Sequence, residues 1–216
     1  STSKVCIIDG YNMSVSVLKH KKTLKIIQIW HSLGAVKKFG KQVLYNNKRK
    51  KVAKLLRMHE NYDLIICSSF ATVKFYKDAF GYPSDKFEII GLPRIDYLLK
   101  NTERNKKKIY SKYPIFKDKK IVLYAPTFRK SSHDYKLEEL INIFNDDEYI
   151  LIIKLHPSIK VDINLSSNSY ICRDFTSLQL LSVCNYVITD YSAISIEASI
   201  LSKPTYIYNY DMKEYY

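Results

Sequence analysis

The sequence predicts an α/β fold in which helices cover both faces of parallel sheets. Short apolar segments of strand length alternate along the chain with segments whose apolar residues recur at helical spacing. Strands that alternate with helices in this way form parallel sheets buried on both faces. Over 216 residues, a hydrophobic fraction of 46% and a charged fraction of 26% fit a globular protein of one large or two small domains.

The first part of the chain contains four expected strands and two expected helices. The strands are expected at residues 5–8, 24–30, 64–67 and 87–90, and the helices at residues 47–59 and 72–80. Gly91 and Pro93 then interrupt the pattern, and a basic cluster follows at Arg104 and residues 106–108 on an expected surface helix. We therefore expect a domain boundary between residues 92 and 93, which gives domains 1–92 and 93–216.

The second part repeats strand and helix regularly. Strands are expected at residues 121–124, 149–155, 170–171, 186–188 and 205–208. Helices are expected at residues 137–144, 178–183 and 192–201, with Thr176 as the N-cap of the second.

Residues 187–197 combine a short apolar strand with residue types that begin a helix. Thr189, Asp190 and Ser192 are the polar residues expected to cap the helix that follows. A helix N-terminus at the carboxyl end of a parallel strand binds phosphate through free N–H groups and the helix dipole. The alternative is an ordinary joint between a strand and a helix.

The net charge of +14 lies almost entirely in the first part of the chain. Residues 1–100 carry 19 Lys and Arg against 7 Asp and Glu, whereas residues 101–216 carry 16 against 14. The stretch from Gly10 to His59 contains 13 basic residues and no acidic residue. Within this block, residues 47–59 have the pattern of a basic amphipathic helix, which suits either a membrane surface or a plain surface helix. The block favours a polyanionic partner: anionic lipid, a phosphate-rich polymer or nucleic acid.

Several classes of protein are disfavoured by what the sequence lacks. No apolar run approaches the roughly 18–20 residues that span a bilayer, and no signal-peptide pattern opens the chain. The four cysteines lack C-x-x-C spacing, which fits a reducing cytoplasm better than a disulfide scaffold or a zinc site. The glycine-rich phosphate-binding fingerprints and a D-x-D pair are also missing. We therefore expect no metal and no cofactor.

Five short segments at the ends of expected strands carry residues suited to phosphate chemistry. They are residues 30–31, 91–96, 125–129, 154–157 and 189–192. The carboxyl ends of parallel strands meet at one edge of a sheet, so these segments could line a single cleft. Their histidines and cations could hold a pyrophosphate without a metal and move a proton.

Each segment also has a simpler interpretation. A histidine beside a tryptophan, as at His31, is often a packed side chain. His156 precedes Pro157 and can merely end a strand, and Arg94 can pair with Asp96 alone.

The five segments together resemble one known family. Residues 27–40 read Ile-Gln-Ile-Trp-His-Ser-Leu-Gly-Ala-Val-Lys-Lys-Phe-Gly. They resemble the W-H-[GA]-x-G-x-x-K-x-x-G signature of the CDP-glycerol glycerophosphotransferases, the teichoic-acid glycerol- and ribitol-phosphate polymerases. The later motifs of that family match in the same order, as Gly-x-Pro-Arg-x-Asp at 91–96, Tyr-Ala-Pro-Thr-Phe-Arg at 124–129, Lys-x-His-Pro at 154–157, and Thr-Asp-Tyr-Ser at 189–192 through Lys-Pro at 203–204 to Asp211.

The resemblance implies a glycosyltransferase-B-like fold of two Rossmann-like lobes with the active site between them. Relative to that family, the chain is expected to be truncated at both ends, so that its activity alone is not assured. The implied reaction transfers glycerol phosphate or ribitol phosphate from CDP-glycerol or CDP-ribitol to a teichoic-acid-like or capsular polymer, and CMP leaves. Domain 1–92 would be the basic lobe on the acceptor and membrane side, and domain 93–216 would bind the nucleotide donor.

The resemblance also implies residue roles. His31 would be the general base for the attacking hydroxyl, and His156 with Lys154 would stabilise charge on the transferred phosphoryl group. Donor phosphates would be held by Arg94, Thr127, Arg129, Thr189 and Ser192. Glu197 would lie near the nucleotide ribose, and the remaining substrate-binding candidates are Gly34, Lys37, Asp96 and Asp190.

Three positions depart from the family pattern. Ser32 stands where Gly or Ala is usual, Ala193 replaces a second serine, and Glu197 replaces the more usual aspartate. These departures indicate a divergent member and bear on the identity of the donor more than on the reaction class.

Two other functions remain open at this point. The same fold serves nucleotide-sugar glycosyltransferases, and the basic block could belong to a nucleic-acid-binding module. No groove-reading or RNA-stacking motif supports the second alternative, so nucleic acid is not an expected partner. We expect a peripheral enzyme at the cytoplasmic face of the cell membrane, with anionic lipid and a polyol-phosphate or lipid-linked glycan acceptor as partners.

Overall fold

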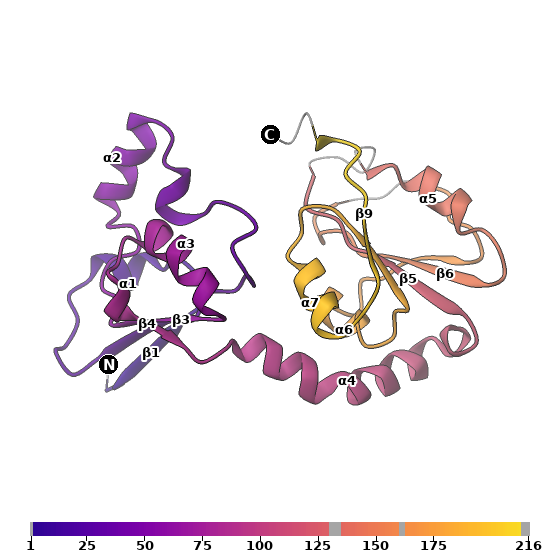
Figure 1. The fold of residues 1–216 in the computed structure, drawn as a ribbon, viewed down its shortest axis with the longest axis horizontal. Coiled ribbons are helices and arrows are strands. Elements are labelled where there is room, and N and C mark those ends of the chain that lie inside the picture. Colours follow the sequence, from indigo (N-terminus) through magenta and orange to yellow (C-terminus); the bar gives the residue numbers. More distant parts are fainter. Residues whose placement is uncertain (1, 130–134, 160–162, 213–216) are drawn as a thin grey trace. The chain divides into compact units, whose positions relative to one another are not determined.

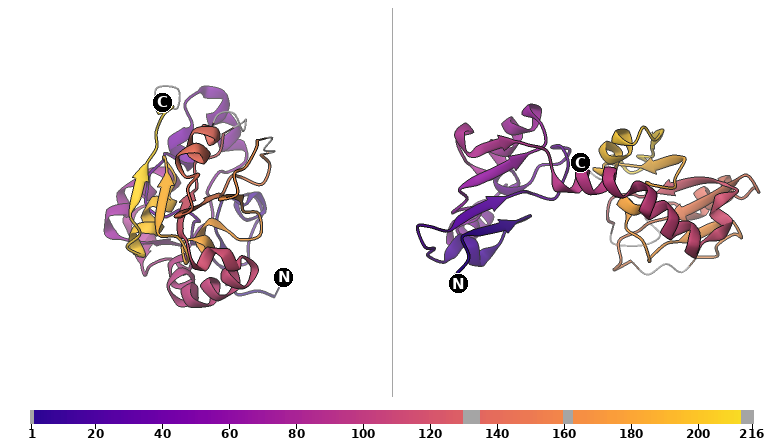
Figure 2. Two further views of the ribbon diagram at one scale, coloured as in Figure 1. Left: turned by 90° about the vertical axis from the view of Figure 1, so that its right-hand side faces the viewer. Right: turned by 90° about the horizontal axis from the view of Figure 1, so that it is seen from below.

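The chain forms two compact units, unit 1 (Ser1–Asp96) and unit 2 (Tyr97–Tyr216), each with its own sheet (Figures 1 and 2). The computed structural model describes residues 2–129, 135–159 and 163–212. Helix α4 (Pro93–Lys112) follows Leu92, and the two units divide between Asp96 and Tyr97 within its first turn, whereas the sequence placed the boundary between residues 92 and 93.

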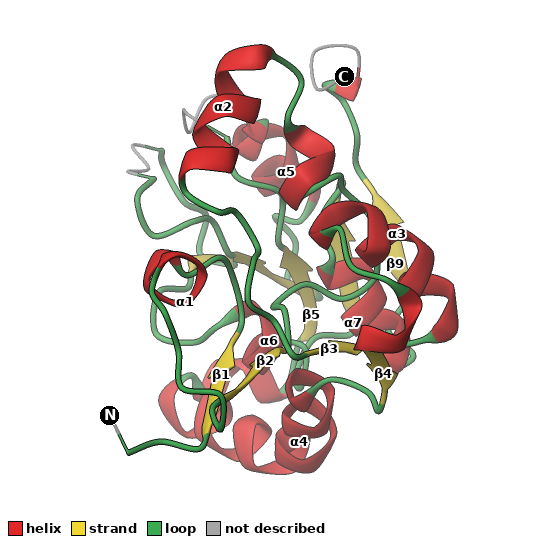
Figure 3. Cartoon of the chain, turned by 90° about the vertical axis from the view of Figure 1, so that its left-hand side faces the viewer, coloured by secondary structure: helices red, strands yellow, loops and turns green. Residues whose placement is uncertain are grey.

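Unit 1 contains a four-stranded parallel sheet in the order β1-β2-β3-β4. Its strands are β1 (Val5–Ile8), β2 (Lys25–Gln28), β3 (Leu64–Cys67) and β4 (Phe87–Ile89). Its α-helices are α1 (Met13–Val17), α2 (Asn47–Leu55) and α3 (Phe70–Phe80) (Figure 3). Two 3-10 turns occur at Gly40–Val43 and Ser84–Lys86. The order of the strands in the sheet is their order in the sequence, so each connection leads to the neighbouring strand.

The core of unit 1 lies between the sheet and α3. Ile26 and Ile65 from the sheet pack in one cluster with Tyr76 and Phe80 from α3. Gly81 ends α3 in the left-handed conformation, with φ at 76°, which only glycine adopts without strain. By contrast, Ile7 on β1 is 61% exposed, so the edge strand is buried less well than the middle of the sheet.

Unit 2 contains a five-stranded parallel sheet in the order β7-β6-β5-β8-β9. Its strands are β5 (Lys120–Tyr124), β6 (Tyr149–Ile153), β7 (Ser169–Ile171), β8 (Tyr186–Thr189) and β9 (Thr205–Ile207). Besides α4, the unit contains the helices α5 (Leu137–Ile143), α6 (Ser177–Leu180) and α7 (Ile194–Ile200). A 3-10 turn spans Pro114–Lys117. The sheet is doubly wound, because the chain runs outward from β5 to β7 and then returns to place β8 on the other side of β5.

Alternate residues of β5 separate the two cores of unit 2. Ile121 and Leu123 belong to the cluster that includes residues of α4, α6 and α7, whereas Val122 and Tyr124 belong to the cluster with α5. Successive side chains of a strand point to opposite faces, so a fully apolar strand buries both. Figure 1 shows α5 on one side of this sheet and α6 and α7 on the other.

All nine expected strands are confirmed, although β2 and β6 end two residues earlier than expected, at Gln28 and Ile153. The other main differences concern helices. The helix expected over residues 47–59 ends at Leu55, because Arg57 and His59 adopt left-handed backbone angles with φ at 48° and 59°. The short helix α1 was not expected from the sequence. Thr176 is confirmed as the N-cap of α6, where its side chain accepts the N–H of Gln179.

Among the described residues, no helix has both the length and the apolar character needed to cross a membrane. The longest one, α4, runs for 20 residues and is mostly polar. All four cysteines are free thiols, and three of them are buried.

Candidate functional site

Three of the predicted segments in unit 2 follow neighbouring strands. Residues 125–129 follow β5, residues 154–157 follow β6, and residues 189–192 end and follow β8. Because β6, β5 and β8 are adjacent in the sheet, the three segments meet at its carboxyl edge. This is the place where open parallel sheets bind ligands.

Asp190 ties the β5 segment to the β8 segment. Its carboxylate accepts the backbone N–H of Thr127 at 2.8 Å and the Thr127 hydroxyl at 2.8 Å. Thr189, which is fully buried, donates its hydroxyl to the Ala125 carbonyl at 2.7 Å. The side chains of Thr189 and Asp190 therefore hold the two strand ends together and do not cap α7.

Arg129 lies at the centre of a buried ionic network. Its Nη1 atom donates to Asp190 at 2.5 Å and to the Thr127 carbonyl at 2.8 Å, while Nε and Nη2 donate to the two oxygens of Asp211 at 2.7 and 2.9 Å. The side chains of Arg129 and Asp190 are only 7% and 1% exposed. The guanidinium also lies 5.4 Å from the centre of the Tyr210 ring.

The network sets the charge state of its members. Burial opposes the charge of Arg129, but the hydrogen bonds to Asp211 and Asp190 outweigh it and raise the guanidinium pKa above its usual range. The hydrogen bond from Arg129 in turn holds the pKa of Asp211 below its usual value. Arg129 therefore remains charged and fixed in place, and its donors are directed to protein oxygens in this structure.

His156 and Lys154 stand at the end of β6. The His156 side chain is exposed, its Nδ1 atom is 2.7 Å from the Ser158 hydroxyl, and its ring lies edge-on to Phe128 at 5.1 Å. Lys154 donates from Nζ to the Cys172 carbonyl at 3.0 Å. The backbone N–H of Lys154 is bound to the Tyr124 carbonyl, which brings the β6 segment against the β5 segment.

Helix α7 begins differently from the expectation. Its N-cap residue is Ala193, without a side-chain cap, and the Ser192 hydroxyl is 3.5 Å from the N–H of Ile194. The expected capping by Thr189 and Asp190 is wrong, because both side chains are engaged with the β5 segment. Glu197 lies in the first turn of α7 and is only 2% exposed.

In unit 1, His31 follows β2 and lies beside the loop after β1. Its ring nitrogen Nδ1 is 2.7 Å from the Asp9 carbonyl, and the ring rests on the Trp30 indole at 4.3 Å while the side chain remains exposed. A carbonyl only accepts, so Nδ1 carries the proton in the neutral ring and Nε2 keeps its lone pair. His31 is thus both packed against Trp30 and able to accept a proton.

The backbone of this loop is held in a tight conformation. Trp30 and Gly34 both have left-handed φ angles, 52° and 64°. The Trp30 N–H donates to the Gln28 side chain at 2.9 Å, and Tyr76 on α3 donates its hydroxyl to the Ser32 carbonyl at 3.0 Å.

The remaining predicted residues are on the surface of unit 1. Lys37 follows the loop and is exposed, and Arg94 and Asp96 are exposed in the first turn of α4. The structure therefore groups the candidate residues by unit. Unit 1 holds His31, Gly34, Lys37, Arg94 and Asp96, and unit 2 holds Thr127, Arg129, Lys154, His156, Thr189, Asp190, Ser192 and Glu197.

Two residues with a part in these arrangements were missing from the predicted site. Asp211 pairs with Arg129, and Gln28 supports the Trp30–His31 loop. Asp211 stands in the last matched motif, which was a usable signal. Gln28 is a lone polar residue inside an apolar strand, and such a residue needs hydrogen-bond partners when it is buried.

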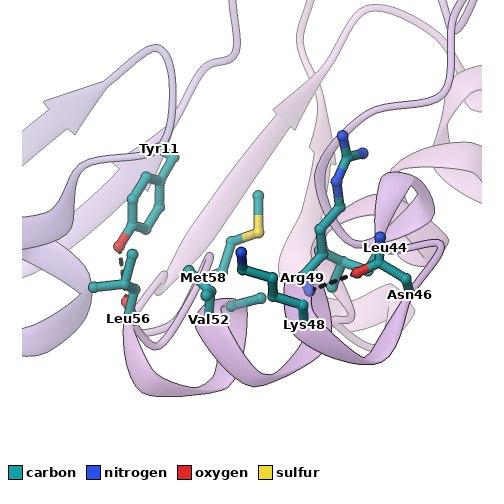
Figure 4. A pocket seen from close by; sticks show the side chains of 9 residues that line it. Tyr11, Leu44, Asn46, Lys48, Arg49, Val52, Leu56 and Met58 are labelled. Carbon is teal, nitrogen blue, oxygen red and sulfur yellow. Dashed lines mark hydrogen bonds between the residues drawn. The ribbon is translucent and has the colours of Figure 1, made fainter.

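A pocket of about 500 Å³ lies beside α2 in unit 1 (Figure 4). Tyr11 forms part of its lining and donates its hydroxyl to the Leu56 carbonyl at 2.8 Å. The wall is mostly apolar, and Lys48, Arg49 and Asn46 supply its polar groups. The other lining residues are Leu44, Val52, Ala53, Leu56 and Met58.

Within residues 2–129, 135–159 and 163–212, no group of three or more His, Cys, Asp or Glu side chains is placed to hold a metal ion.

Comparison with curated proteins gives relatives that match almost all of this chain. This chain is 36% identical over 226 residues to the teichoic acid glycerol-phosphate primase of Bacillus subtilis strain 168. The match covers 99% of this chain and 57% of that protein. This chain is also 32% identical over 229 residues to the teichoic acid poly(ribitol-phosphate) polymerase of Bacillus spizizenii, covering 100% of this chain and 37% of that protein. The chain thus spans about half the length of these relatives or less.

Solved structures support the fold. A structure of the wall teichoic acid polymerase TagF matches with a TM-score of 0.80 at 21% identity, covering 98% of this chain and 56% of that one. A UDP-GlcNAc 2-epimerase from Neisseria meningitidis matches with a TM-score of 0.59 at 16% identity, covering 94% of this chain and 58% of that one. The glycosyltransferase-B-like fold expected from the sequence is confirmed.

The sequence pattern of one family matches residues 1–216, the full extent of the chain. The match agrees with the five ordered segments, three of which the structure gathers at one sheet edge of unit 2. The chain therefore belongs to the CDP-glycerol:poly(glycerophosphate) glycerophosphotransferase family.

Proposed function

We propose that this protein transfers a polyol phosphate, either glycerol phosphate or ribitol phosphate, from a CDP-linked donor to a teichoic-acid-like or capsular polymer. The match of the family over the whole chain carries this proposal. The relatives named above are a glycerol-phosphate primase and a ribitol-phosphate polymerase, so similarity supports the reaction class and leaves both polyols open. An acceptor hydroxyl oxygen forms a bond to the donor phosphorus, the bond to the CMP oxygen breaks, and CMP leaves.

In this proposal His31 is the general base. The contact between Nδ1 and the Asp9 carbonyl leaves Nε2 as the proton acceptor, and Nε2 has no hydrogen-bond partner within the described part of the chain. The base removes the proton of the acceptor hydroxyl as that oxygen attacks phosphorus. Gly34 and Lys37 belong to the same loop, where Lys37 would attract the phosphates of a substrate.

Unit 2 would hold the donor at the carboxyl edge of its sheet. Lys154 and His156 would stabilise negative charge on the transferred phosphoryl group, and Ser192 would contact a donor phosphate. Arg129, Asp190 and Thr189 would act mainly as a scaffold, since their side chains already bind one another or neighbouring protein groups. Thr127 belongs to the same scaffold through its hydrogen bonds to Asp190, and Glu197 would lie near the nucleotide ribose. Arg94 and Asp96, in unit 1, remain predicted substrate contacts.

The two histidines provide the main test. His31→Ala should leave CDP-donor affinity within a few fold and lower turnover by about 100- to 10,000-fold, the usual effect of losing a general base. His156→Ala should weaken donor binding and lower turnover as well, because a group on the phosphoryl oxygens acts in both states. Calorimetry would measure affinity, and CMP release would measure turnover.

His20→Ala is the matched control, because His20 is a histidine of unit 1 outside the predicted site, with its Nε2 2.5 Å from the Val15 carbonyl. It should change neither quantity by more than a few fold. Near-normal turnover of His31→Ala, or complete loss of donor binding, would rule out the base assignment.

The identity of the donor is tested by product analysis. CDP-glycerol, CDP-ribitol and UDP-sugars are offered in parallel, with and without excess EDTA. Transfer of polyol phosphate that persists in EDTA is expected, because Lys154 would supply positive charge and His156 a hydrogen bond at the phosphates. Transfer of a sugar alone would favour the nucleotide-sugar glycosyltransferase, and loss of donor binding that magnesium restores would refute metal-free binding.

We also propose that unit 1 binds anionic lipid at the cytoplasmic face of the cell membrane, as a peripheral protein whose acceptor is lipid-linked. The exposed lysines of α2 support this, as does Leu55, which is 78% exposed on the same helix. The adjacent pocket has an apolar wall with Lys48 and Arg49, a combination that suits an acyl chain below a phosphate (Figure 4).

Liposome retention distinguishes specific binding through α2 from nonspecific attraction by the net charge of the protein. Vesicles with anionic lipid should retain the protein at low salt and release it as salt rises, because screening sets in over roughly 8–10 Å. Reversing Lys50, Lys51 and Lys54 to Glu should weaken retention. The control reverses three exposed lysines of α4, Lys100, Lys107 and Lys108, with the same change of charge.

Equal loss in both triple variants would show that only net charge matters. Equal retention by neutral vesicles would remove the electrostatic role. Steeply salt-dependent binding of random nucleic acid, stronger than that of the vesicles, would favour the nucleic-acid module instead.

A further inference from the structure

We propose that Gln28 is a positioning residue that fixes both the location and the tautomer of His31. The proposal rests on the assignment of His31 as the base, and it adds the means by which the fold prepares that base. Besides Gln28, the proposal involves four residues of unit 1: Asp9 and Gly10, which follow β1, and Trp30 and His31, which follow β2.

Gln28 is a polar side chain in a fully buried position. It is 0% exposed at the last position of β2, between Ile8 of β1 and Ile65 of β3. A buried amide is retained only where its donors and acceptor are satisfied. Packing alone would be served by an apolar residue, as at Ile26 and Ile27 earlier in the same strand.

The two ends of the Gln28 amide bind the two loops that meet at His31. Nε2 donates to the Gly10 carbonyl at 2.9 Å, and Oε1 accepts the backbone N–H of Trp30 at 2.9 Å. Gly10 follows Asp9, whose carbonyl binds His31, and Trp30 precedes His31. One side chain thus spans the segment that supplies the carbonyl and the segment that supplies the imidazole.

The conformation of Trp30 requires such support. Its φ of 52° lies in the left-handed region, which a bulky residue adopts only when its surroundings compensate. Two contacts offset the cost of this conformation. The backbone N–H of Trp30 donates a hydrogen bond to Gln28, and the indole ring stacks on Phe39 with the ring centres 4.5 Å apart. This backbone turn presents His31 to solvent.

The tautomer follows from the spacing of the two loops. His31 Nδ1 lies 2.7 Å from the Asp9 carbonyl, so the proton resides on Nδ1 and the lone pair on Nε2. If Gln28 no longer held Gly10 and Trp30 together, the carbonyl would move relative to the ring. The Nδ1 tautomer would then lose its preference, and the attacking hydroxyl would meet a base that is often protonated on the wrong nitrogen.

Gln28→Met tests this, because methionine has similar length and no amide. Nitrogen-15 NMR of the histidine ring reports the tautomer directly and needs no activity. The wild type should show a protonated Nδ1 at His31, and Gln28→Met should show a mixture of the two tautomers. Turnover should fall by up to about 100-fold, the effect of a small misplacement of a reacting group, while donor affinity stays within a few fold.

Thr72→Val is the matched control, since it removes one buried hydroxyl hydrogen bond from unit 1, the 2.7 Å contact to the Ser69 carbonyl. It should leave the His31 tautomer and turnover unchanged. If Gln28→Met does not fold, Gln28→Glu keeps an acceptor for Trp30 and replaces the donor to Gly10 by a carboxyl oxygen, at the cost of burying an acidic group, with the same expected shift of tautomer.

A wild-type His31 protonated on Nε2, or an unchanged tautomer in a folded Gln28 variant, would overturn the proposal. The base assignment fails separately, through near-normal turnover of His31→Ala. If the tautomer shifts in Gln28→Met while His31→Ala remains active, Gln28 positions His31 but His31 is not the base.

Discussion

Replacing Arg129 by methionine should destabilise unit 2 by about 3–5 kcal/mol, the range for removing one partner of a buried ion pair. Methionine keeps much of the apolar stem and removes the guanidinium. Four hydrogen bonds disappear, two to Asp211, one to Asp190 and one to the Thr127 carbonyl. Summing them at 1.5–3 kcal/mol each would overshoot, because the bonds share one group and desolvation of the ion opposes them.

The largest part of the loss should come from Asp190. Its side chain is 1% exposed, whereas that of Asp211 is 17% exposed and can gain water. Without Arg129, Asp190 retains only the bonds from Thr127 among those the structure describes. Its charge is then buried without a counter-ion, so Asp190→Asn should destabilise the wild type but restore stability in the Arg129→Met background.

Urea unfolding followed by circular dichroism measures these free energies, provided that the slope of the transition is unchanged. Arg173→Met in unit 2 is the matched control, because the hydrogen bonds of exposed Arg173 to other described residues go to the carbonyls of Pro157 and Ile159 alone. It should cost about 1 kcal/mol or less. A loss below about 1 kcal/mol in Arg129→Met, or a further loss on adding Asp190→Asn, would refute the buried-charge argument.

Two further predictions concern unit 1. His59 is 1% exposed, and burial, with a contribution from Lys41, lowers its pKa to about 4. The unfolded chain, with an ordinary histidine pKa of about 6.5, takes up the proton first, so stability is full above that pH and falls by about 3 kcal/mol as the pH drops to 4. Urea midpoints across this range should show the loss, and His59→Asn, which tolerates the positive φ, should flatten it; an equal slope in both proteins would contradict the assignment. Gly40 has φ at 55°, and an added Cβ would lie 2.4 Å from the Ala79 carbonyl oxygen, so Gly40→Ala should cost about 2–4 kcal/mol. Gly91→Ala has a positive φ of 83° without a close neighbour and should cost only about 1–2 kcal/mol, so equal losses in the two variants would argue against the clash.

The sequence by itself determined the strands and the order of the motifs. Apolar runs of strand length are local signals, and β1 and β3 were predicted with the boundaries that the structure shows. The Thr176 cap was also local, because donor and acceptor lie three residues apart. Since parallel strands align their carboxyl ends, the meeting of residues 125–129, 154–157 and 189–192 at one edge followed from the strand pattern.

Only the tertiary structure decided which polar groups bind each other. Arg129 pairs with Asp211, 82 residues away, and with Asp190, 61 residues away, and no sequence period relates these positions. Asp190 was expected to cap the helix that follows it, yet β8 returns beside β5 and puts Thr127 and Arg129 within its reach. Gln28 acquires its role in the same way, since a buried amide must bind whatever groups the neighbouring strand ends bring to it.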